Sequence, residues 1–251
     1  MTYKQITFVI GLLVLCSCKQ ENNLTRIEGV RIEINDSLER DMVIDSFIRP
    51  YREHVNANLD SIISYAANTY SKTDGELNTA IGNLMADLVY ERANPVFFSR
   101  TGQNIDMVLL NHGGIRAILS KGPVRTRNAY EIMPFENSIV VAEMKGQYID
   151  SLIAHLLVSK RAHPISRLNL DVSEDFKLIQ ANINGENISK DRTYYVATND
   201  YLFYGGDRMN FFQKSDSLHV LNYKIRNAMI DYFKTKDTLS PVIDSRFQII
   251  R

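Results

Sequence analysis

Hydrophobic residues recur every three or four positions in four stretches of the chain, which places them on one side of a helix. The pattern predicts helices at residues 37–58, 77–93, 146–159 and 221–233. Pro50 is expected to kink or interrupt the first helix and Pro95 to stop the second, because proline lacks the N–H that a helix interior needs. Thr126 is expected to cap a short helical turn that continues through Tyr130.

Short runs rich in β-branched and aromatic residues lie between these helices and are typical of strands. They predict strands at 61–70, 106–110, 138–144, 168–172, 176–183, 193–198 and 246–250. The pair Asn184–Gly185 favours a tight hairpin turn, because asparagine and glycine tolerate a positive φ. The sequence shows no internal repeat. This order of elements predicts an α+β fold, with one domain at 61–251 preceded by a linker-type helix at 37–60.

The first residues resemble a bacterial export signal. Lys4 precedes an apolar run at 6–15, which is too short to anchor in a bilayer but has the length of a signal-peptide core. The run ends in Cys16-Ser17-Cys18, similar to the lipobox of bacterial lipoproteins. We therefore expect a lipoprotein signal peptide at 1–18 with Cys18 as the lipidated residue; the alternative is an ordinary cleaved signal. Residues 19–36 would form a tether, and the chain would be lipid-anchored in the cell envelope, facing the periplasm or the cell surface.

The composition is that of a globular domain, with 45% hydrophobic and 23% charged residues in a chain of 251. Lysine plus arginine and aspartate plus glutamate each total 29, so no excess positive charge is available to attract DNA or RNA. No cysteine follows Cys18. Disulfides and thiol chemistry are therefore excluded from the mature sequence.

A glycine-containing segment follows the predicted strand at 106–110. It reads Asn-His-Gly-Gly-Ile-Arg at 111–116, and α/β architectures place ligand loops at the C-terminal ends of strands. Gly113 and Gly114 would let backbone amides approach a ligand, and Arg116 would add a cation suited to phosphate or ribose oxygens. The alternative is a tight turn at the strand exit, with Arg116 paired to a surface carboxylate.

Aromatic rings and a carboxylate occur in two later segments. Phe135 lies on a loop stiffened by Pro134, and Tyr201 follows a predicted strand. Gly205-Gly206-Asp207 comes next, and a carboxylate beside two glycines is poorly placed for core packing but can accept hydrogen bonds from ribose hydroxyls. Taken alone, each ring is more typical of the core. Together the segments predict a nucleoside or nucleotide pocket, because a base offers flat faces for stacking.

The order of these motifs resembles the C-terminal domain of bacterial and animal 5′-nucleotidases over residues 60–250, beginning with Ile-Gly-Asn-Leu-Met-Ala-Asp at 81–87. The resemblance implies a mixed sheet with packed helices, and a helix at 37–58 like the one that joins the two domains of full-length members. It implies that Phe135 and Tyr201 stack on the base, while Asp207 holds the ribose. Asn111 would contact the base or ribose edge, and Arg116 would lie near the ribose and phosphate. The substrate-binding residues expected are Asn111, Gly113, Gly114, Arg116, Phe135, Tyr201, Gly205, Gly206 and Asp207.

The sequence departs from the family pattern at two positions. Family members commonly carry an arginine several residues before the helix that begins near residue 81, where this chain has Thr-Asp-Gly-Glu at 73–76 and only Lys72 as a replacement. The residue after Gly-Gly-Asp is usually glycine, and here it is Arg208. Arg208 is expected either to narrow the pocket or to supply the missing cation.

The catalytic half of the family, a metallophosphatase that binds two metal ions, has no counterpart in this sequence. The five histidines do not fall in an Asp-x-His or Gly-x-His-x-His spacing, and His112 is expected at the pocket rim or in a hydrogen bond rather than on a metal. Nucleophile and phosphate-loop motifs are absent as well. We expect no catalytic residue, metal ligand or cofactor in this chain, and divalent metals in a partner subunit.

Three hypotheses follow for the function. In the first, the chain is the nucleotide-binding half of a split 5′-nucleotidase and presents its ligand to a separately encoded metallophosphatase. In the second, it is a stand-alone lipoprotein that binds nucleosides or sugar nucleotides without catalysis. In the third, Arg208 closes the pocket of a degenerate scaffold.

Overall fold

The computed structural model of the chain describes residues 3 and 24–250. Apart from Tyr3, the predicted signal peptide at 1–18 with Cys18 lies outside the described residues, as does the start of the predicted tether. The chain divides into two compact units, Met1–Ile48 and Arg49–Arg251, and the second unit contains the folded domain. Residues 24–41 form no helix or strand. Within the described part of the chain, no helix combines the length and apolar character that a membrane span requires.

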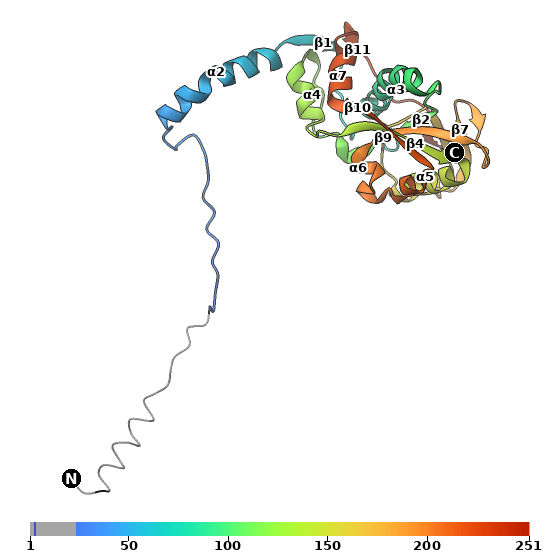
Figure 1. Cartoon of the computed structure of the whole chain (residues 1–251), viewed down its shortest axis with the longest axis horizontal. Coiled ribbons are helices and arrows are strands. Elements are labelled where there is room, and N and C mark those ends of the chain that lie inside the picture. The colour runs from blue at the N-terminus through green and yellow to red at the C-terminus, as the bar shows by residue number, and fades with distance from the viewer. Residues whose placement is uncertain (1–2, 4–23, 251) are drawn as a thin grey trace. The chain divides into compact units, whose positions relative to one another are not determined.

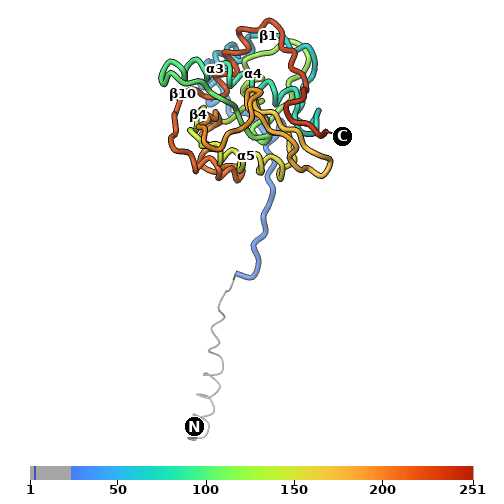
Figure 2. Tube along the Cα trace, turned by 90° about the vertical axis from the view of Figure 1, so that its right-hand side faces the viewer, coloured from blue at the N-terminus to red at the C-terminus, as the bar shows by residue number. Residues whose placement is uncertain are grey.

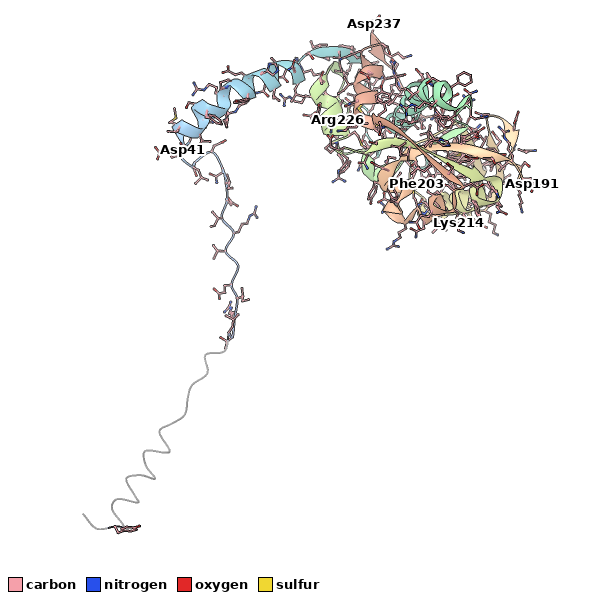
Figure 3. All side chains as sticks on the ribbon, in the orientation of Figure 1. Asp41, Asp191, Phe203, Lys214, Arg226 and Asp237 are labelled. Atoms are coloured by element: carbon pink, nitrogen blue, oxygen red, sulfur yellow. The ribbon has the colours of Figure 1, made fainter. Side chains whose placement is uncertain are left out.

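Helix α2 (Met42–Leu59) corresponds to the linker-type helix predicted at 37–58. It begins later than predicted because Asp41 caps it: the carboxylate accepts from the N–H groups of Val43 (2.9 Å) and Ile44 (3.1 Å). Figure 3 marks Asp41 at this end of the helix. Pro50 lies inside α2 without interrupting it, and none of the residues of α2 is buried.

The domain has the mixed α+β architecture that the sequence predicts. Its helices are α3 (Ala80–Thr101), α4 (Thr126–Ile132), α5 (Gly146–Ser159), α6 (Asp200–Phe203) and α7 (Ile225–Phe233). Its strands are β1 (Ile62–Ala66), β2 (Met107–Leu109), β3 (Gly122–Arg125), β4 (Ser138–Lys145), β5 (Ile165–Ser166), β6 (Leu168–Val172), β7 (Leu178–Ile183), β8 (Glu186–Asn187), β9 (Thr193–Asn199), β10 (Ser217–Lys224), β11 (Thr238–Leu239) and β12 (Phe247–Ile249). Short 3-10 turns cover His112–Gly114, Gly206–Arg208 and Asn210–Lys214.

A five-stranded mixed sheet in the order β10-β4-β9-β2-β5 lies at the centre of the domain. Helices α3 and α5 lie on opposite sides of β4 in both views (Figures 1 and 2). Side chains along β2 alternate accordingly: Val108 packs in the half of the core that includes α3, whereas Met107 and Leu109 pack in the half that includes α5. Two smaller sheets, β11-β1-β3 and β12-β6-β7-β8, complete the domain.

The predicted hairpin turn at Asn184–Gly185 joins β7 to β8, and both residues have a positive φ, 56° and 79°. Asn184 Nδ2 donates to the carbonyl oxygen of Asp106 (3.2 Å), directly before β2. The Asp106 carboxylate accepts from Arg192 Nη2 and from the N–H of Tyr195, both at 2.8 Å. The hairpin and β9 therefore hold the first residues of β2 in place.

The predicted end of the second helix at Pro95 is wrong, because α3 continues through this proline to Thr101. Pro95 is exposed, whereas Ala93 and Phe97 on either side of it are fully buried. Packing of these side chains on the core therefore outweighs the hydrogen bond that the proline removes, a loss of about 3 kcal/mol. Gly102 ends the helix instead, with φ at 71° and its N–H donating to the carbonyl oxygen of Phe98.

The predicted helix at 221–233 is wrong in its first four residues. Residues 217–224 form β10, which pairs antiparallel with β4, Leu218 opposite Ala142 and Val220 opposite Val140. The helix α7 begins only at Ile225. Leu221, near the end of β10, and Ile225, at the start of α7, are both buried in the same half of the core. Their spacing in the sequence therefore resembles that of apolar residues on one face of a single helix. The short strands β3, β5, β8 and β11 were not predicted.

Candidate functional site

Three segments distant in sequence meet at one edge of the central sheet. Strand β2 is parallel to β9, so the residues that follow both strands lie at the same edge. Strand β4 is antiparallel to β9, with Ile139 opposite Asn199, so the loop before β4 reaches that edge as well. The first segment carries Asn111, the second Phe135 and the third Tyr201 with Asp207. The pairing of these strands therefore assembles the predicted pocket residues.

A cavity of about 360 Å³ lies between these segments. This volume falls within the range of small-molecule sites, roughly 300 to 1,000 Å³. The residues that line it are Asn111, Gly113, Gly114, Arg116, Met133, Phe135, Asn137, Asn199, Tyr201 and Asp207. Of the residues predicted to bind substrate, only Gly205 and Gly206 do not line the cavity.

The Asp207 carboxylate is held from two sides. Oδ2 accepts from Asn111 Nδ2 (2.7 Å), and Oδ1 accepts from Tyr201 Oη (3.0 Å). Asp207 has φ at 51°, in the left-handed region that non-glycine residues rarely adopt. Such a strained conformation persists only where the surroundings enforce it, and these two hydrogen bonds do so. The carboxylate keeps further lone pairs with which to accept from a ligand.

The two predicted aromatic rings both reach the surface of the cavity, with 41% of Phe135 and 48% of Tyr201 exposed. The Arg116 guanidinium carbon lies 5.8 Å from the centre of the Phe135 ring. Arg116 is exposed, and no ion pair to it occurs among the described residues. The alternative in which a surface carboxylate neutralises Arg116 therefore finds no support in the structure.

The glycines of the site make room for neighbouring side chains. A Cβ on Gly206 would lie 2.5 Å from carbons of the Tyr201 ring, and one on Gly114 would lie 2.9 Å from Asn111 Oδ1. The N–H of Gly114 is already bonded to the carbonyl oxygen of Asn111 (3.0 Å). Gly205 has φ at 95°, a conformation that favours glycine. These glycines therefore position Tyr201 and Asn111.

The Phe135 loop is held from behind by Arg226, which Figure 3 marks near the start of α7. Arg226 is buried, and its Nη1 donates to the carbonyl oxygens of Pro134 (3.3 Å) and Phe135 (3.4 Å). Its guanidinium lies over the Tyr130 ring and pairs with Glu136. Hydrogen bonds from Lys224 and Arg226 lower the pKa of the Glu136 carboxyl to about 2. Glu136 is therefore charged at neutral pH.

Residues 55–214 match the model of the family described as "5′-nucleotidase, C-terminal domain". The chain belongs to this family. Two solved structures share the fold of this 5′-nucleotidase domain. The 5′-nucleotidase precursor of Thermus thermophilus superposes with a TM-score of 0.68 at 20% identity, over 84% of this chain and 43% of that one. The NAD nucleotidase of Haemophilus influenzae superposes with a TM-score of 0.62 at 17% identity, over 100% of this chain and 46% of that one.

Relatives of this 5′-nucleotidase C-terminal domain are longer proteins. The chain is 26% identical over 206 residues to the cell wall protein Lmo0130 of Listeria monocytogenes, a match that covers 76% of this chain and 25% of that protein. It is 25% identical over 187 residues to a 5′-nucleotidase of Vibrio vulnificus, covering 70% and 31%. Protein UshA of Escherichia coli is 33% identical over 111 residues, covering 43% and 20%. The chain thus spans less than a third of each of these relatives.

The structure adds Met133, Asn137 and Asn199 to the lining of the cavity in this 5′-nucleotidase domain. Asn199 also caps α6 by accepting from the N–H of Leu202 (2.8 Å), and Asn137 Nδ2 donates to Asp200 Oδ1 (3.0 Å). An asparagine directly after a predicted strand is a helix-cap signal, so Asn199 could have been found from the sequence. Nothing in the sequence marks Asn137.

Lys72 and Arg208, the two cations considered as replacements for the missing family arginine, do not line this cavity. Lys72 Nζ donates to the carbonyl oxygen of Ile115 (2.8 Å), so it supports the backbone of the 111–116 segment. Arg208 lines a neighbouring cavity instead. The structure therefore gives no support to the expectation that Arg208 narrows or closes the nucleoside pocket.

His112 is hydrogen-bonded through Nδ1 to the carbonyl oxygen of Ala162 (3.2 Å) and is half-buried. Burial lowers the pKa of its imidazole, followed by weaker effects that include the charges of Lys72 and Arg161. Among the described residues, no group of three or more His, Cys, Asp and Glu side chains is arranged to hold a metal ion. The residues of the described domain therefore do not fit the two-metal centre of a metallophosphatase.

Proposed function

We propose that this chain is the nucleotide-binding half of a split 5′-nucleotidase and presents its ligand to a separate phosphatase subunit. The observation that carries the proposal is the doubly held Asp207 carboxylate in a cavity that exposes the Phe135 and Tyr201 rings. A base would stack on the rings, a ribose hydroxyl would donate to Asp207, and Arg116 would attract the phosphate. A nucleotide carries all three chemical features.

Phosphate ester hydrolysis would take place on the partner subunit, which would supply the divalent metals. In this proposal the described residues bind and orient the nucleotide without transferring a proton or attacking the phosphorus. One relative is named as a 5′-nucleotidase, and the match covers 31% of its length, which leaves room in that protein for a second domain. Attachment through a lipid on Cys18 would place the complex at a membrane surface in the cell envelope.

The folded unit also offers a surface for such a partner. Within Arg49–Arg251, helix α2 presents Tyr51 and Val55 one turn apart, 67% and 51% exposed, and no residue of the helix is buried. Apolar side chains at this spacing form one stripe of a helix. We propose that this stripe contributes to the contact with the phosphatase. A Tyr51→Ser, Val55→Ser double variant should then lose the complex in a co-purification while it binds nucleotide with unchanged affinity.

Calorimetry with adenosine and AMP tests the binding site directly. Stacking of a base on an aromatic ring is worth roughly 1 to 3 kcal/mol, so Phe135→Ala should weaken binding about tenfold or more. Phe98→Ala is the matched control, because Phe98 is exposed to a similar extent (51%) on α3 and lines no part of the cavity. Equal affinities for wild type, Phe135→Ala and Phe98→Ala would overturn the proposed pocket.

Two further measurements separate the split enzyme from a stand-alone binding protein. The chain alone should release no phosphate from AMP in the presence of a chelator, and turnover under that condition would contradict the proposal. Addition of the phosphatase should raise nucleotide affinity if both subunits contact the ligand. An affinity unchanged by the phosphatase favours a binding lipoprotein without catalysis.

A further inference from the structure

A second cavity, of about 480 Å³, adjoins the nucleoside cavity. Gly113 and Asp207 line both, so the Asp207 side chain stands between them. The remaining residues of the second cavity are His112, His155, Val158, Ser159, Arg161, His163 and Arg208. The cavity belongs neither to the predicted nucleoside site nor to any role assigned so far.

The charged groups of the second cavity are unbalanced. Arg161 and Arg208 are both exposed at its rim, and neither forms an ion pair or a side-chain hydrogen bond within the part of the chain that the structure describes. The only carboxylate that lines it is that of Asp207, which already accepts from Asn111 and Tyr201. With neutral histidines, two positive charges therefore face one negative charge.

The histidines add hydrogen-bonding groups to this basic rim. His163 is buried and lines the cavity, and its Nδ1 accepts from the N–H of His112 (3.3 Å), which leaves the hydrogen on Nε2. His155 is half-buried and packs its ring against those of His163 and Phe211, with no hydrogen bond to its nitrogens among the described residues. Burial lowers the pKa of His155, while the charge of Asp207 opposes this shift. An imidazole N–H is therefore available without a positive charge.

We propose that this second cavity is a phosphate-binding subsite in which Arg161 and Arg208 hold a phosphate group and His155 donates a hydrogen bond to it. Guanidinium groups bind phosphate oxygens through paired N–H donors, and these two guanidiniums lack competing carboxylates. The Asp207 carboxylate opposes the same anion across the shared wall. The affinity of the subsite for phosphate is thus the result of attraction by two arginines and repulsion by one aspartate.

The phosphate can come from solution or from a nucleotide, and its position decides between the two. If Asp207 receives the ribose hydroxyls, as the proposed function holds, the second cavity begins beside the 2′ and 3′ positions of the ribose. A phosphate on either position would reach the subsite while the other hydroxyl remained for Asp207. This assignment of the source rests on the proposed function, whereas binding of inorganic phosphate does not depend on it.

Calorimetric titration with inorganic phosphate is the direct test. Arg161→Gln and Arg208→Asn should each weaken binding about tenfold, because each removes a charge-assisted interaction. Asparagine is chosen at 208 because it tolerates the φ of 63° there. Arg40→Gln is the matched control, an exposed arginine that lines neither cavity. No binding by the wild type, or equal loss in all three variants, would overturn the proposal.

Asp207→Asn separates this inference from the proposed function. The variant removes the repulsion, so affinity for inorganic phosphate should rise severalfold, whereas affinity for adenosine should fall because the acceptor for the ribose is weakened. If adenosine binds and phosphate does not, the subsite is refuted while the nucleoside site stands. If phosphate binds and adenosine does not, the reverse holds.

Titration with the 2′-, 3′- and 5′-monophosphates of adenosine identifies the source. A phosphate held on the ribose should make the 2′ or 3′ isomer bind more tightly than adenosine, and Arg208→Asn should abolish that gain but leave the 5′ isomer unaffected. If neither the 2′ nor the 3′ isomer gains affinity while inorganic phosphate binds, the ligand is free phosphate. If inorganic phosphate also fails, the subsite is refuted.

Discussion

The ring of Tyr201 rests on Gly206, so closely that a Cβ at position 206 would lie 2.5 Å from the ring carbons. Gly206→Ala should therefore displace the ring from the wall of the cavity. We expect adenosine affinity to fall about tenfold, since base stacking on one ring is worth roughly 1 to 3 kcal/mol. Gly29→Ala is the control, because a Cβ there meets no atom within 4 Å. Unchanged affinity in Gly206→Ala would show that the position of Tyr201 is not required.

Arg226 is expected to position the Phe135 loop. Arg226→Met removes the donor to the carbonyl oxygens of Pro134 and Phe135, which should lower stability by about 1 to 3 kcal/mol and weaken adenosine binding. Arg92→Met is the matched control, since Arg92 also binds a carbonyl oxygen, that of Asp231, and lies over a tyrosine ring away from the cavity. Urea unfolding and calorimetry should show a stability loss in both variants and an affinity loss in Arg226→Met alone.

His163 should make the fold sensitive to acid. Burial lowers its pKa to about 4 from the ordinary 6.5, with smaller contributions from His155 and His112. Between these two pH values the unfolded chain binds a proton at His163 that the folded chain does not. The free energy of unfolding is therefore not reduced by His163 above pH 6.5, and it falls as the pH decreases below that value. The loss at pH 4 should be roughly 3 kcal/mol, since one pKa unit corresponds to about 1.4 kcal/mol.

Urea unfolding measured from about pH 7 down to about pH 4 gives this dependence. In His163→Asn the amide oxygen can replace Nδ1 as acceptor for the N–H of His112. The free energy of unfolding of this variant should change less with pH than that of the wild type. The burial of His112 and His155 lowers their pKa values in the same direction, so some slope should remain. An identical slope in wild type and variant would exclude His163 as the cause.

Arg208→Gly should stabilise the chain. Arg208 has φ at 63°, a conformation that costs an L-residue about 1 to 2 kcal/mol and glycine almost nothing, although glycine also loses more entropy on folding. We expect a net gain of about 1 kcal/mol in thermal or urea unfolding. Adenosine affinity should not change, because Arg208 does not line the nucleoside cavity. A gain in adenosine affinity would restore the hypothesis that Arg208 obstructs this pocket.

The convergence of the pocket could be predicted because its three segments carry glycines, aromatic residues and a carboxylate next to predicted strands. The alternation of β2 and the helical stripe of α5 were likewise present in the sequence, and the structure confirms both elements. The α+β class followed from their order. These features depend on local patterns, which a sequence displays directly.

The rest depended on contacts that a local pattern does not contain. Pro95 was expected to end α3, but burial of Phe97 carries the helix past it. Leu221 lies in a strand because β10 pairs with the edge of β4, whose residues come about 80 positions earlier in the chain. Arg226 supports a loop that it reaches only through the packing of α7. Each of these errors reflects tertiary contacts that override local preference.

The two ends of β2 have separate tasks. Its first residues are clamped through Asp106 to the Asn184–Gly185 hairpin and to β9, while its last residues lead into the ligand-facing turn at Asn111. A fluorophore or fusion attached at Gly185 in that hairpin would lie at the opposite end of β2 from the nucleoside cavity. Immobilising the protein on a surface through this position should leave the entrance of the cavity accessible.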